Sequence, residues 1–141
     1  MKKEMGNLAG SIVERLIGEG FIVQRYDAYS TDSIYLKLDY GVCNSIRVSS
    51  HAGKKHLKYR YNIGPYIDEY RVVKDKYDRF YYPEDGLEDM IAKIMDDREL
   101  KLSRYGCESY ARYMMKNKRD KAGSSGCWRE AAVLNGRENA G

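Results

Sequence analysis

The stretch SIYLKLDY, residues 33–40, alternates between apolar and polar side chains. Successive side chains of a β-strand point to opposite faces of its sheet. The alternation therefore predicts a half-buried strand with one face toward the core and the other face polar. We expect Ile34, Leu36, Leu38 and Tyr40 on the core face, and Tyr35, Lys37 and Asp39 on the polar face.

Further short β-prone runs lie on both sides of this stretch and are separated from it by turn-forming residues. Strands that follow one another through short turns are typical of an antiparallel sheet. We therefore expect a sheet of four to six strands, with one face covered by helices. The other expected strands are 21–26, 46–49, 57–63, 70–73 and 78–82.

Apolar residues recur at helical spacing before the strands and twice after them. The first stripe runs from Met5 to Ile17 and the second from Leu87 to Met95, while Cys107, Tyr110, Ala111 and Met114 indicate a third helix. Asp85 and Glu88 have the spacing of a capping box at the start of the second helix. The predicted fold class is α+β: an N-terminal helix, an antiparallel sheet and two C-terminal helices.

The chain of 141 residues is long enough for one domain. We expect that domain to span 1–118. Residues 119–141 are basic and then small and polar, so we expect a C-terminal tail that is mobile or orders only on assembly, with Trp128 as its one anchor.

The aromatic content is unusual, with 14 tyrosines against two phenylalanines and one tryptophan. This composition predicts a small core supplemented by tyrosine rings, whose hydroxyls lie at a surface or an interface. Self-association would bury more apolar area, so we expect a homo-oligomer.

Other features of composition bear on where the protein works. No apolar run approaches the roughly 18 residues of a membrane span, and the N-terminus has no secretory leader pattern. Three widely spaced cysteines, Cys43, Cys107 and Cys127, fit free thiols in a reducing compartment. We therefore expect a cytoplasmic protein that does not contact a membrane.

Charge is concentrated in one segment. Residues 46–61 contain five basic side chains and two histidines but no acid. If the two strands of this segment pair as a hairpin, their polar side chains converge on one sheet face. Arginine binds phosphate through a planar fork, and tyrosine offers a ring for stacking. The candidate anion-binding residues are Arg47, Ser49, His51, Lys54, Lys55, Lys58, Arg60 and Asn62, with Tyr35 and Tyr59 as stacking or packing groups.

A plain solvated strand face is the alternative interpretation of this segment, because lysines on a sheet also discourage aggregation. The remaining candidates for chemistry are weaker. His51 and His56 have the components of a metal-free ribonuclease, but in no known motif. Cys43 is expected to be a structural or incidental thiol, and Asp96 and Asp97 are expected to be solvated. No metal or cofactor motif is present, so we expect neither.

Three segments carry a resemblance to a known group of proteins. They are 33–41 (SIYLKLDYG), 45–51 (SIRVSSH) and 54–63 (KKHLKYRYNI), which span about a fifth of the chain. Together they resemble a region of small proteins of Firmicutes phages and prophages. In those proteins the middle segment commonly has an acidic residue before its histidine, where this chain has Ser50.

The resemblance implies a phage counter-defence factor that binds a target instead of catalysing a reaction. We expect a protein that sequesters an anionic ligand, foremost a nucleotide immune signal. The alternative is a protein inhibitor of the anti-CRISPR type, which docks on a host nuclease and blocks its nucleic-acid site. A small ribonuclease is the second alternative, and direct nucleic-acid binding is also open.

Overall fold

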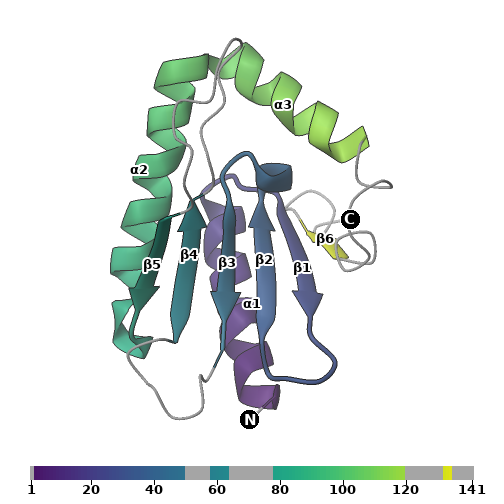
Figure 1. Ribbon diagram of the computed structural model, residues 1–141, viewed down its shortest axis with the longest axis vertical. Coiled ribbons are helices and arrows are strands. Elements are labelled where there is room, and N and C mark those ends of the chain that lie inside the picture. Colours follow the sequence, from purple (N-terminus) through teal and green to yellow (C-terminus); the bar gives the residue numbers. More distant parts are fainter. Residues whose placement is uncertain (1, 50–57, 64–77, 120–131, 135–141) are drawn as a thin grey trace.

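The computed structural model describes residues 2–49, 58–63, 78–119 and 132–134. It confirms the α+β class, with a helix, a six-stranded antiparallel sheet and two further helices (Figure 1). The elements, in chain order, are α1 (Lys2–Gly18), β1 (Val23–Asp27), β2 (Ile34–Leu38), η1 (Asp39–Gly41), β3 (Ser45–Val48), β4 (Tyr59–Ile63), β5 (Asp78–Tyr82), η4 (Glu84–Gly86), α2 (Leu87–Tyr105), α3 (Cys107–Arg119) and β6 (Ala132–Leu134).

The sheet has the order β5-β4-β3-β2-β1-β6. Strands β1 to β5 form a meander in which each strand pairs with the next one along the chain. Strand β6 pairs with β1, so part of the stretch that we expected to form a tail belongs to the sheet. The strand expected at 70–73 and the anchor Trp128 lie outside the described residues.

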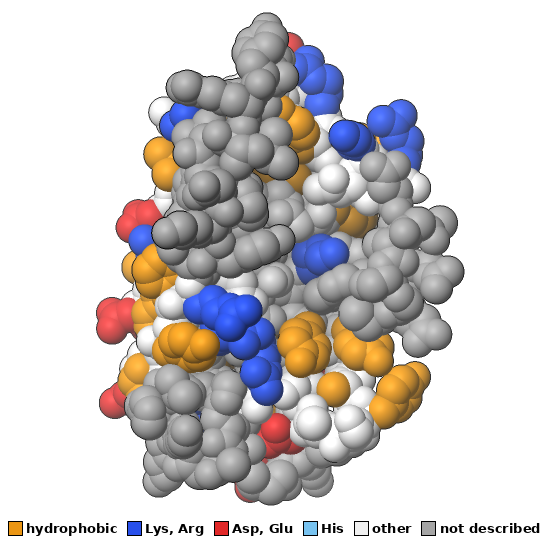
Figure 2. Space-filling model, in the orientation of Figure 1, with side chains coloured by type: hydrophobic (Ala, Val, Ile, Leu, Met, Phe, Trp, Pro, Cys, Tyr) orange, Lys and Arg blue, Asp and Glu red, His pale blue; other side chains and the backbone are white. Residues whose placement is uncertain are grey.

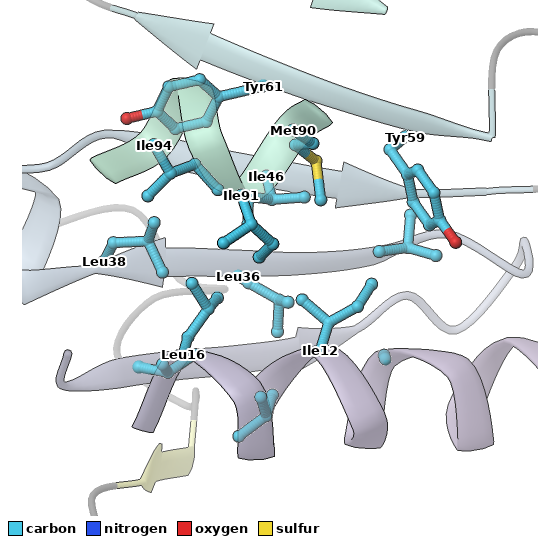
Figure 3. Packing of buried hydrophobic residues seen from close by; sticks show 14 of the residues in the cluster. Ile12, Leu16, Leu36, Leu38, Ile46, Tyr59, Tyr61, Met90, Ile91 and Ile94 are labelled. Carbon is cyan, nitrogen blue, oxygen red and sulfur yellow. The ribbon is translucent and has the colours of Figure 1, made fainter. Parts of the chain in front are cut away.

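Helices α1 and α2 cover the same face of the sheet, and the core lies between them and the strands. Figure 3 shows Ile12 and Leu16 of α1 and Ile91 of α2 packed near Leu36 of the central strand β2. These four side chains are 3% exposed or less. Burying each contributes roughly 1.5–3 kcal/mol, so this small cluster holds the helix layer on the sheet.

The start of α2 differs from the prediction. Residues 84–86 form a short 3-10 turn, so Gly86 is the N-cap and no side chain caps the helix. The predicted capping box of Asp85 and Glu88 is therefore wrong. The Glu88 carboxylate instead accepts two hydrogen bonds from Arg15 of α1, at 2.6 and 2.9 Å, and links the two helices.

Strand β2 ends earlier than the alternation predicted. Asp39 and Tyr40 follow it in left-handed conformations, with φ of 51° and 54°. The turn breaks the two-residue period, and both side chains are buried. Asp39 therefore does not extend the polar face of the sheet, as we had expected from its position.

Candidate functional site

The sheet face opposite α1 and α2 carries the polar side chains of the alternating strands. Register places Tyr35, Arg47 and Arg60 side by side on β2, β3 and β4. Asn62 lies two residues along β4 from Arg60 and pairs with Ser45. Figure 2 views this face and shows Lys and Arg side chains near its centre, with side chains of the hydrophobic class, which includes Tyr, on either side. The structure thus brings four of the predicted ligand-binding residues together.

Arg47 and Arg60 form the centre of this group. They are direct Cα partners across β3 and β4. Side chains in such positions have Cβ atoms about 4.5–5.5 Å apart, where like charges destabilise a sheet. Within the described residues neither arginine forms an ion pair with a carboxylate; Arg47 donates to the Ser33 hydroxyl at 3.2 and 3.3 Å. The pair therefore presents positive charge that no carboxylate of the described residues neutralises and that an anion would neutralise.

Two buried polar atoms at this site lack a hydrogen-bond partner among the described residues. They are Arg60 Nε, a donor, and Asn62 Oδ1, an acceptor. Leaving a buried polar group unsatisfied costs roughly 1–3 kcal/mol, so such groups are uncommon in folded proteins. Since neither atom is exposed to solvent, a ligand with an acceptor and a donor would satisfy both only once the side chains that cover them move aside.

Strand β5 adds two residues to the site that our sequence analysis did not identify. Tyr81 is the register partner of Arg60, and Arg79 is the partner of Asn62. Both residues are exposed, and Tyr81 is 44% exposed. The alternation of residues 78–82 places Arg79 and Tyr81 on the face opposite Phe80. This alternation is visible in the sequence, but it assigns Arg79 and Tyr81 to the site only once β5 is known to pair with β4.

Three predicted site residues contribute little or nothing to this surface, because all three are buried. The Tyr59 ring is on the helix-covered face, 1% exposed, and its hydroxyl donates to Glu84 O at 3.1 Å. Tyr59 therefore packs in the core and does not stack on a ligand. Ser49 is buried and its hydroxyl donates to Asp32, while Lys58 is only 9% exposed. Both are placed on the polar side by strand period but offer little surface. His51, Lys54 and Lys55, together with His56, lie outside the described residues.

A second polar cluster lies inside the protein, where β4 meets α2. The Asp97 carboxylate accepts hydrogen bonds through Oδ2 from Tyr61, Asn44 and Lys101, at 2.6, 2.9 and 3.0 Å. Asp97 and Lys101 are 3% and 4% exposed. The prediction that Asp97 is solvated is therefore wrong, whereas its neighbour Asp96 is exposed.

The pKa values of this cluster follow from burial and pairing. Burial alone would raise the pKa of Asp97, but the Lys101 charge and the three hydrogen bonds outweigh it and hold the pKa below its usual value. Burial, reinforced by the Asp97 charge, raises the pKa of the Cys43 thiol to about 12. A thiol with such a pKa is a poor nucleophile at neutral pH.

Asp39 forms a related contact near the start of α3. Its carboxylate accepts hydrogen bonds from the Tyr110 hydroxyl at 2.5 Å and from the Ile22 amide at 3.0 Å. Burial raises the pKa of Asp39 despite these two bonds. With Asp97, this contact ties both C-terminal helices to one end of the sheet, and we assign both carboxylates a structural role.

Two further observations concern the described residues, and a third concerns the whole chain. They contain no group of three or more His, Cys, Asp or Glu side chains placed to hold a metal ion. No helix among them has the length and apolar character needed to cross a membrane. Comparisons of this chain with protein-family models, with curated proteins and with solved structures found no match.

Proposed function

We propose that this protein is a binding protein for a nucleotide, which it holds on the polar face of the sheet at Arg47 and Arg60. The observation that supports the proposal most strongly is the direct pairing of these two arginines without a neutralising acid among the described residues. Two guanidinium forks side by side suit the oxygens of a phosphate group.

A nucleotide satisfies the site better than a simple anion does. Inorganic phosphate would satisfy the donor Arg60 Nε through its oxygens. The P–OH group of inorganic phosphate and the sugar hydroxyls or base amines of a nucleotide can each donate to Asn62 Oδ1, so the base is what distinguishes a nucleotide. Its base has a flat face for the exposed ring of Tyr81.

The wider role that we propose is counter-defence in a phage or prophage, by sequestration of a nucleotide immune signal without catalysis. This role rests on the resemblance of residues 33–63, which include the paired residues Arg47 and Arg60 and the sheet partner of Arg47, Tyr35. A sequestering protein of this kind acts by holding its ligand, so it needs a charged, aromatic surface more than it needs a nucleophile.

The binding test is calorimetric titration of adenine and guanine mono- and dinucleotides into the purified protein. Arg47→Ala and Arg60→Ala should each weaken binding by about 10- to 100-fold, the effect of losing a charged hydrogen-bonding group. Arg112→Ala removes the same charge from the exposed surface of α3 and should change affinity by less than about twofold. Wild-type affinity in both sheet variants would show that the ligand binds elsewhere.

The counter-defence test measures phage plaques on a bacterial host that carries a nucleotide-signalling defence. Expression of the wild-type protein should restore plaque formation, and Arg60→Ala should not. If both proteins restore plaque formation, the biological role does not depend on this site. A native mass spectrum of the purified protein, at multiples of 16.3 kDa, would in addition give the oligomeric state and the mass of any retained ligand.

A protein inhibitor that docks on a host nuclease is the second candidate. The acidic residues along η4 and α2 other than Asp97 support it, because they are exposed, and those other than Glu88, which pairs with Arg15, offer carboxylates that imitate phosphates. Asp89→Lys and Asp96→Lys should then weaken docking strongly at low salt and less at high salt. These exposed acids are Glu84, Asp85, Glu88, Asp89, Asp96 and Glu99.

The ribonuclease alternative depends on His51 and His56, which lie outside the described residues. It predicts that the purified protein cleaves RNA without added metal and that His56→Ala abolishes cleavage. Cleavage that persists in that variant would end this alternative.

A further inference from the structure

The order of side chains across the sheet narrows the class of ligand. Tyr35, Arg47, Arg60 and Tyr81 are consecutive register partners on β2, β3, β4 and β5. Across the sheet, the row therefore consists of a tyrosine ring, two guanidinium groups and a second tyrosine ring, and it is symmetric about the arginine pair. Figure 2 shows the same order of types, with blue side chains between orange ones on this face.

The spacing of the row is set by the sheet. Neighbouring strands lie about 4.8 Å apart, so Tyr35 and Tyr81 are separated by three strand spacings, or about 14 Å. A base contacts a tyrosine ring at about 3.5–4.0 Å. One base therefore cannot contact both rings, and a ligand with a single base leaves one of them unused.

We infer that the row recognises a phosphodiester-linked pair of nucleotides, with one base on Tyr35, the other on Tyr81 and the phosphates over Arg47 and Arg60. This inference rests on the proposed function and specifies the ligand of the same site. A free dinucleotide, linear or cyclic, and two successive nucleotides of a single strand share this chemistry.

The matched ligands are adenosine 3′,5′-bisphosphate, with one base and two phosphates, and 5′-phosphorylated ApA, with two bases and two phosphates. Both are titrated into the wild-type protein by calorimetry, and again as their guanine counterparts. The two-base ligand should bind at least about tenfold tighter, because each stacked base adds affinity of that order. Equal affinity of the two ligands would overturn the inference.

The tyrosines are tested separately. Tyr81→Ala should weaken the two-base ligand by about tenfold and the one-base ligand by no more than about twofold, since the Tyr35 ring remains available to a single base. Tyr81→Phe keeps the ring and should bind the two-base ligand like wild type. Tyr29→Ala, which removes a tyrosine 80% exposed outside the row, is the control and should change neither affinity.

The outcomes separate this inference from the proposed function. If Arg60→Ala weakens binding but Tyr81→Ala weakens both ligands equally or neither, the site binds nucleotides and the two-base arrangement is wrong. If the wild-type protein binds neither ligand at about 1 mM, the proposed function fails and this inference fails with it.

The two sources of the ligand are distinguished by cyclic diadenylate and a ten-nucleotide oligoadenylate. A strand-binding site should favour the ten-mer, with affinity that falls steeply as salt rises, because more phosphates are neutralised. A site for a free dinucleotide should bind the ten-mer no more tightly than the two-base ligands and show a shallow salt dependence.

Discussion

The Tyr61 hydroxyl on β4 donates a hydrogen bond to Asp97 Oδ2 on α2 over 2.6 Å, in a part of the core where Tyr61 has no exposed surface. The same oxygen also accepts from Lys101 at 3.0 Å. Tyr61 is also the neighbour of Arg60 along β4, and its side chain points to the opposite face. The buried network therefore fixes the strand that carries half of the arginine pair.

Removing the Asp97 charge should destabilise the protein strongly. Asp97→Asn leaves Lys101 buried without its counter-ion, and breaking a buried pair in this way costs about 3–5 kcal/mol. The matched control is Asp96→Asn, the exposed neighbour, which should change the free energy of unfolding by less than about 0.5 kcal/mol. Urea unfolding of the two variants measures both values, and equal stability would show that the Asp97–Lys101 pair contributes nothing.

Asp97 and Asp39 should affect the pH dependence of stability with opposite signs. The pKa of Asp97 is lowered in the folded protein, so its contribution is present above the unfolded value of about 3.9 and is lost as pH falls below it. The pKa of Asp39 is raised, so its ionisation reduces stability as pH rises above about 3.9.

The measurement is the free energy of unfolding from pH 3 to pH 7 for the wild type, Asp97→Asn and Asp39→Asn. The loss of unfolding free energy caused by Asp97→Asn should shrink as pH falls below about 4. The unfolding free energy of Asp39→Asn should rise relative to that of the wild type as pH rises above about 4. Parallel curves for all three proteins would contradict both pKa directions.

The thiols should differ in reactivity. Cys43 is buried with a pKa of about 12, whereas Cys107 is exposed at the start of α3. In a Cys127→Ser background at pH 8, a maleimide reagent should label one thiol in the native protein and two after denaturation. Labelling followed by peptide mass analysis identifies the site; rapid native labelling of Cys43 would show that the core around Tyr61 opens readily.

Gly106 should be difficult to replace, because it joins α2 to α3 with φ of 82° and ψ of 157°. Residues with a Cβ avoid this conformation, so Gly106→Ala should cost about 1–3 kcal/mol. Gly18→Ala is the control, since a Cβ at the end of α1 meets nothing within 4 Å and should be neutral or stabilising by up to about 1 kcal/mol. Thermal unfolding of both variants tests the contrast.

The sheet and its polar face could be predicted because they depend on a local period. Alternation in residues 33–40 and 46–49 places Tyr35 and Arg47 on one face whichever strands pair, and the register then brings them together. The contribution of Tyr81 could not be predicted in the same way. It depends on the pairing of β5 with β4, which are separated in the sequence by the further strand expected at 70–73.

The buried carboxylates were harder to predict for different reasons. Asp97 and Lys101 continue the helical stripe of Met90 and Ile94 at spacings of three and four, so the period places them toward the core. We had assumed that adjacent acids are solvated, and we gave residue type more weight than position. Asp39 left the strand face through a left-handed turn that its sequence does not reveal.

The position of β6 also affects how the chain reaches its fold. Strands β1 to β5 pair in chain order, so each can form a hairpin with its predecessor as it is synthesised. Strand β6 is different, because it must return from the C-terminal end to pair with β1 near the start. A contact between residues so far apart in the sequence forms only at a large entropic cost of loop closure. Among the described elements the last pairing to form should therefore be β6 with β1, after the face that carries Arg47 and Arg60 is already assembled.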